Sequence, residues 1–110
     1  MFRCKRSLAV LCAVLGLGVL ALGFSNTPEE EKNIAALKRF YTEVMNKGNM
    51  KAIDELVADN FVEHYLPDPS LPPNKAGVTQ SMTMFRAAFP DMQITVEDVI
   101  AKGDKVWAYT

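Results

Sequence analysis

Residues 89–110 read FPDMQITVEDVIAKGDKVWAYT, and this stretch decides the fold class. Pro90 ends the preceding helix, because proline lacks a backbone N–H and its ring clashes with the helical turn before it. Apolar and polar residues alternate over 92–97, which is typical of a half-buried strand. Residues 102–104, KGD, predict a turn, and 106–110 return as a second strand. The stretch therefore predicts a helix followed by an antiparallel hairpin.

The segment before this stretch predicts a helix that starts after Asn74, a favourable N-cap residue. One apolar stripe follows helical spacing and contains Val78, Met82, Phe85 and Phe89. Residues 67–73, PDPSLPP, hold four prolines and predict a stiff loop of the kind that often rims a pocket. Residues 58–66 are rich in β-favouring side chains and predict an extended segment or an irregular turn.

Two further helices are expected nearer the N-terminus. Thr27, followed by Pro28 and then Glu30, has the pattern of a capping box, in which cap and third residue bond each other's backbone. Gly48 ends this first helix, and Asn49 can cap a shorter one. Because the helices precede the strands without βαβ alternation, the order predicts an α+β domain with helices on one face of an antiparallel sheet.

The first 25 residues differ from the rest of the chain. Arg3, Lys5 and Arg6 precede an uncharged apolar run over 8–22, the layout of a secretory signal peptide. We therefore expect residues 1–24 to be a signal peptide and 27–110 a domain that is exported, by secretion or to a periplasm. The alternative is membrane attachment through residues 7–28, which are long enough to span a bilayer.

Composition excludes several classes of function. Residues 1–25, here called the head, carry a charge of +3. The rest of the chain has 9 Lys and Arg against 13 Asp and Glu and carries −4. Nucleic acid is not an expected partner, because phosphate binding needs a clustered basic surface. Both cysteines lie in the head, at Cys4 and Cys12, and no metal-ligand spacing occurs. No metal and no cofactor are expected.

Two strands alone make a marginal sheet with open edges. The strand pattern continues to Thr110 without a turn or polar tail. We therefore expect the domain to be incomplete at its C-terminus, as the front part of a longer protein. The alternative is a partner subunit that completes the sheet.

Five short segments in order resemble the SnoaL-like polyketide cyclase, or ester cyclase, family. They are 40–49 FYTEVMNKGN, 54–56 DEL, 61–64 FVEH, 89–91 FPD and 96–106 VEDVIAKGDKV. The resemblance implies an α+β domain in which helices pack on a curled antiparallel sheet, the cone-shaped nuclear transport factor two-like fold. It also implies a deep apolar pocket, cofactor-free ring closure, and a homodimer as common in that superfamily. Members usually continue with further strands and a late acidic residue, so the resemblance covers their N-terminal part.

The same resemblance makes His64, the single histidine, the candidate catalytic acid/base. Imidazole suits the role because its ordinary pKa lies near neutrality. The alternative is a half-buried histidine that bonds the proline-rich loop. Aromatic and methionine side chains that could line the pocket are the candidate ligand-binding residues, with a plain core role as the alternative: Tyr41, Phe61, Tyr65, Met82, Phe85, Phe89, Trp107 and Tyr109.

The expected function is an exported protein that binds a small apolar carbonyl compound and carries out cyclase- or isomerase-type acid/base catalysis. Two alternatives remain at this point. One is a non-catalytic pocket for a hydrophobic ligand on the same fold, and the other is an interaction module.

Overall fold

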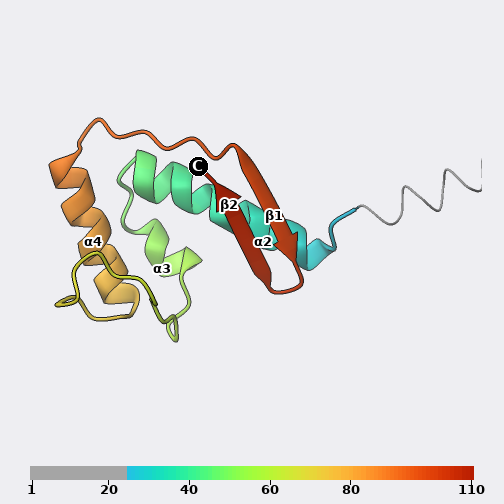
Figure 1. Ribbon diagram of the computed structural model, residues 1–110, viewed down its shortest axis with the longest axis horizontal. Coiled ribbons are helices and arrows are strands. Elements are labelled where there is room, and N and C mark those ends of the chain that lie inside the picture. The colour runs from blue at the N-terminus through green and yellow to red at the C-terminus, as the bar shows by residue number, and fades with distance from the viewer. Residues whose placement is uncertain (1–24) are drawn as a thin grey trace, which may run out of the picture.

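The computed structural model describes residues 25–110, so the expected signal peptide or anchor at 1–24 lies outside the described residues. The described chain forms helices and one hairpin in the order expected from the sequence (Figure 1). The elements are α2 (Pro28–Arg39), the π-helix η1 (Phe40–Asn46), α3 (Ala52–Leu56), α4 (Lys75–Ala88), β1 (Asp98–Lys102) and β2 (Lys105–Tyr109). The α+β prediction is confirmed.

The first helix begins with the predicted capping box. Thr27 Oγ1 accepts the backbone N–H of Glu30 at 3.2 Å, and Glu30 Oε2 accepts that of Thr27 at 2.8 Å. Each group thereby satisfies a helix-end donor that has no partner within the helix. The four residues Thr27 to Glu30 therefore determine where α2 starts.

Glu30 also ties this helix start to the hairpin. Its second oxygen, Oε1, accepts the backbone N–H of Gly103 at 2.8 Å, although the two residues lie 73 positions apart. Gly103 has φ 60°, a left-handed value that glycine adopts without steric cost. The side chain of Glu30 is buried, and the bonds from Thr27, then from Gly103, hold its pKa below the ordinary value of 4.5. The carboxylate is thus charged at neutral pH and joins α2 to the β1–β2 turn.

This contact predicts a pH-dependent stability. Folding lowers the pKa of Glu30 from 4.5. The charged carboxylate therefore stabilises the folded protein above pH 4.5, and this contribution is lost as the pH falls through the folded-state pKa. In Glu30→Gln, the urea midpoint of the full chain should be lower than in the wild type at neutral pH. The gap should close as the pH falls below 4.5 and the carboxylate becomes protonated. Glu29→Gln, in the same turn but exposed, is the control; an equal pH-dependent gap there would contradict the role of Glu30.

The helix α2–η1 is the central element around which the other elements pack. The hairpin contacts α2, whereas α3 and α4 contact η1. The hairpin and the two helices therefore pack against different parts of the continuous helix α2–η1 (Figure 1). In η1 the hydrogen bonds widen to a five-residue spacing, as from Lys47 N–H to the carbonyl of Thr42 at 3.2 Å. The sequence predicts a helix here but not this wider turn.

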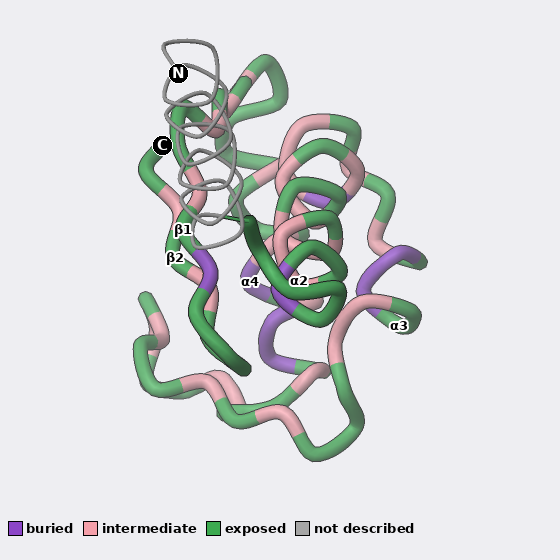
Figure 2. Tube along the Cα trace, turned by 90° about the vertical axis from the view of Figure 1, so that its right-hand side faces the viewer, coloured by how far each residue is buried: buried purple, intermediate pink, exposed green. Residues whose placement is uncertain are grey.

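The core lies where η1, α3 and α4 meet (Figure 2). Its buried members are Val44, Ala52, Ile53 and Val78. Val44 and Ile53 are fully buried, at 0 % exposure. Partly buried apolar residues surround them: Phe40, Met50, Leu56, Val57, Phe61 and Met82. Although α3 has only five residues, Ala52 and Ile53 anchor it in this core.

Residues 92–97 correct the sequence prediction, because they form no strand. The first strand of the hairpin is β1, at Asp98–Lys102, paired antiparallel with β2. The segment is instead held by a side chain: Asn46 Nδ2 donates to the carbonyl of Ile94 at 2.8 Å, and Asn46 Oδ1 accepts the Ile94 N–H at 2.7 Å. One amide thus satisfies the two groups that a neighbouring strand would otherwise bond.

Asn49 also differs from expectation, since its side chain caps no helix. It donates to Glu43 Oε2 at 3.4 Å, while its backbone carbonyl accepts the N–H of Ala52 at 3.2 Å. The helix α3 has Lys51 at its N-cap and no side-chain cap. The turn is made instead by Gly48, which has φ 70° and packs beside Arg86.

Candidate ligand-binding groove

The proline-rich loop folds back onto the first turn of α4. Asn74 caps the helix as expected, accepting the N–H groups of Ala76 and Gly77 at 3.0 and 3.3 Å. The backbone of Pro72 lies so close to Gly77 that no Cβ would fit there. The carbonyl of Pro73 also accepts the N–H of Glu63 at 3.1 Å. These contacts hold the loop against the helix.

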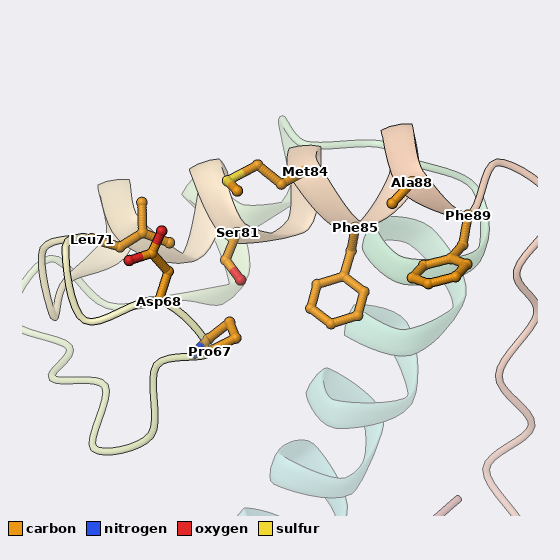
Figure 3. A pocket seen from close by; sticks show the side chains of 8 residues that line it. All are labelled: Pro67, Asp68, Leu71, Ser81, Met84, Phe85, Ala88 and Phe89. Atoms are coloured by element: carbon orange, nitrogen blue, oxygen red, sulfur yellow. The ribbon is translucent and has the colours of Figure 1, made fainter.

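A groove of about 270 Å³ opens between this loop and α4 (Figure 3). The loop contributes Pro67, Asp68 and Leu71, and the helix with its C-cap contributes Ser81, Met84, Phe85, Ala88 and Phe89. Six of these eight side chains are apolar. The volume of the groove lies just below the usual range for ligand pockets, about 300–1,000 Å³, so a small ligand would fill it.

The two phenylalanines form the aromatic wall of the groove. Their ring centroids lie 6.3 Å apart with an interplanar angle of 36°. Phe85 is 37 % exposed and Phe89 54 % exposed, so their faces are available to a ligand. Figure 3 shows both rings on the same side of α4 as Ser81, with Pro67 opposite. The wall offers two aromatic rings, inclined to each other, for contact with an aromatic or cyclic compound.

Two polar side chains line the groove. Ser81 is buried, at 4 % exposure, and its hydroxyl points toward the open space (Figure 3). Asp68 Oδ1 accepts the backbone N–H of Ser70 at 2.8 Å. The Ser70 hydroxyl and this backbone N–H hold the pKa of Asp68 below its ordinary value of 3.8. The groove therefore contains one neutral hydroxyl and one negative charge at neutral pH.

A second cleft, of about 560 Å³, lies between α2–η1, the end of α3 and the hairpin turn. Its apolar wall includes Phe40, Leu56, Val57 and Phe61, which are packed against the core cluster. Three polar residues, Asn33, Glu63 and Asp104, also border it. Much of this wall is therefore the flank of the core, whereas Phe85 and Phe89 of the groove on α4 lie outside the core cluster.

The structure divides the residues predicted to bind a ligand. Phe85 and Phe89 line the groove, and Phe61 lines the second cleft. Met82 packs against the core cluster. Tyr41 is half-buried and meets Phe40 edge-on, with centroids 6.3 Å apart.

The remaining predicted residues line neither space. His64 and Tyr65 are exposed on a segment without regular structure, Tyr65 at 85 %. Trp107 and Tyr109, at 55 % and 67 % exposure, alternate along β2 with the half-buried Val106 and Ala108. Because side chains alternate between the two faces of a strand, Trp107 and Tyr109 share the more exposed face of β2. The nine predicted residues are thus divided between the groove, the second cleft, the core flank and the exposed surface.

Ser81 is the polar residue of α4 in the groove that the sequence analysis missed, together with the apolar Met84 and Ala88. It lies three residues after Val78 and four before Phe85, so the helical spacing of the apolar stripe already places it on the same face. A single serine among apolar residues at that spacing is the signal by which the sequence could have identified Ser81 as a groove residue. Pro67 and Leu71 belong to the loop that was expected to rim a pocket.

Among residues 25–110, no cluster of three or more His, Cys, Asp or Glu side chains could hold a metal ion. Over the same range, no helix has the length and apolar character needed to cross a membrane.

Comparison with known proteins gives one finding. The family described as SnoaL-like polyketide cyclase matches residues 35–110, which is well over half of the chain. No curated protein and no solved structure matches the chain.

Proposed function

Because the chain belongs to the SnoaL-like polyketide cyclase family, we propose that it binds a small apolar carbonyl compound in the groove between the proline-rich loop and α4. The proposal includes the export expected from the basic and apolar head. The observation that carries it is the half-exposed pair Phe85 and Phe89, which lies outside the core cluster and faces the loop. Apolar area of this kind is stabilised when a ligand covers it.

Ligand binding is better supported than catalysis. His64 is exposed and does not line the groove, although it precedes the groove residue Pro67 by only three positions. A general acid or base must reach the reacting atom within hydrogen-bond distance or through one water molecule. The groove's own titratable group, Asp68, is already engaged by Ser70. The function that the geometry supports best is therefore binding.

The test is a substitution in the aromatic wall. Phe89→Ala in the full chain should weaken binding of the neutral fluorescent probe N-phenyl-1-naphthylamine by roughly tenfold. The reason is that the probe can no longer cover the exposed part of the phenylalanine side chain, about half of its apolar surface. Phe89 is 54 % exposed, so its removal should disturb the fold little.

The matched control is Ile100→Ala. Ile100 is an apolar residue of similar exposure, 62 %, on the hairpin and away from the groove. Its removal should leave probe affinity unchanged. Equal affinities of the wild type and Phe89→Ala would place the binding site elsewhere and contradict the proposal.

A further inference from the structure

Ser81 is unusual among the hydroxyl side chains of α4. Thr79 and Thr83 each donate to the backbone carbonyl four residues earlier, at 3.0 and 2.7 Å. The Ser81 hydroxyl makes no such bond within the described chain. Every fully buried side-chain nitrogen or oxygen atom of residues 25–110 has a hydrogen-bond partner. The Ser81 oxygen is not one of these fully buried atoms, because its hydroxyl is directed to the open groove, as Figure 3 shows.

A hydroxyl in this position favours a ligand that carries an oxygen. A ligand covering the apolar walls would remove water from Ser81, and an unpaired buried polar group is costly. A carbonyl oxygen can accept the hydrogen bond that the departing water leaves open. A pure hydrocarbon cannot do so.

Asp68 should discriminate between ligands by their charge. It lines the same groove and is negative at neutral pH. Lys75 and Arg86, the cationic side chains of α4, do not line the groove. Lys75 Nζ is 2.8 Å from Asp59, and Arg86 donates to the carbonyls of Met45 and Met92. An anionic ligand would therefore meet a like charge with no opposite charge in the groove lining.

We propose that Ser81 and Asp68 determine the specificity of the groove: Ser81 Oγ donates a hydrogen bond to the oxygen of a neutral ketone or aldehyde, and the Asp68 carboxylate excludes acids. This inference rests on the proposed function, because it concerns the ligand of the same groove. The tilted rings of Phe85 and Phe89 add a preference for a flat, aromatic body. The ligand class is then a neutral aromatic carbonyl compound.

The test uses three naphthalene probes of similar shape: 2-acetylnaphthalene, 2-isopropylnaphthalene and 2-naphthoate. Binding to the full chain is measured by calorimetry at neutral pH. The wild type should bind the ketone roughly three- to tenfold more tightly than the hydrocarbon, as expected for one net hydrogen bond. It should bind naphthoate more weakly than the ketone.

Two variants test the roles of Ser81 and Asp68 independently. Ser81→Ala should abolish the preference for the ketone and leave the affinity for the hydrocarbon unchanged, which also shows that the groove remains formed. Asp68→Asn retains an acceptor for Ser70 and should raise naphthoate affinity by roughly threefold or more, with little change for the ketone. Thr83→Ala, which removes an exposed hydroxyl of the same helix, should change none of these affinities.

The outcomes distinguish the two proposals. If the wild type binds none of the three probes, the groove is not a site for small apolar compounds and the proposed function fails. If the probes bind but Ser81→Ala keeps the ketone preference, Ser81 is not the hydrogen-bond donor. If Asp68→Asn leaves the affinity for naphthoate unchanged, Asp68 does not exclude anions.

Discussion

Ile53→Ala should lower the free energy of unfolding by about 3 kcal/mol, one of the two largest effects expected for a single substitution in this chain. Ile53 is at 0 % exposure in the cluster that joins η1, α3 and α4. The substitution removes three carbon atoms and leaves a cavity that the surrounding helices can fill only in part. Since α3 has five residues, it has few other apolar contacts to retain it. Urea denaturation of the full chain, followed by far-UV circular dichroism, measures the change.

Val62→Ala is the matched control. Val62 is a β-branched apolar residue at 55 % exposure, so its loss should change the free energy of unfolding by about 0.5 kcal/mol or less. Equal losses for the two variants would mean that the cluster around Ile53 is not the core of the folded protein. A loss below about 1 kcal/mol for Ile53→Ala would lead to the same conclusion.

Gly77→Ala should be the other strongly destabilising substitution, with a loss of about 2–3 kcal/mol. In most helices alanine is favoured over glycine by about 1 kcal/mol. Helix preference alone would therefore make Gly77→Ala stabilising, whereas we expect it to lower the free energy of unfolding. At Gly77 the added Cβ would lie 2.9 Å from the carbonyl carbon of Pro72 and closer still to its oxygen. Because both partners are backbone, either the loop or α4 must move.

This displacement has a second consequence, because the loop forms one wall of the groove. Gly77→Ala should therefore weaken N-phenyl-1-naphthylamine binding as well as stability. Gln80→Ala, at an exposed position of the same helix, should change neither. A Gly77→Ala protein with wild-type stability would falsify the close contact between the loop and α4.

Local signals in the sequence predicted the ends and types of most elements. Thr27 and Glu30 form the expected capping box, Asn74 caps α4, and Gly103 provides the left-handed turn residue of the hairpin. Each of these signals works through hydrogen bonds or backbone angles within a few residues. Such signals can be read without knowledge of the rest of the chain.

Residues 92–97 show where local signals fail. Their alternation is that of a strand, but a strand also needs a partner for its backbone groups. At Ile94 that partner is the side chain of Asn46, 48 residues earlier. The five resembling segments contain Asn46, Gly48 and Gly103, and in this structure all three stabilise turns or connections. The family pattern therefore reports the fold more directly than the site.

The sequence by itself determined the class of the domain, α+β, the N-caps of α2 and α4, the hairpin turn and the family. It also placed Phe85 and Phe89 on one helical face. Only the tertiary structure decided which predicted residues share a space. The reason is that a groove is made by the distance between separate segments, here the loop and α4, and Gly77 against Pro72 sets that distance. His64 and Trp107 carried the right chemistry, but the packing of the chain leaves both outside the groove.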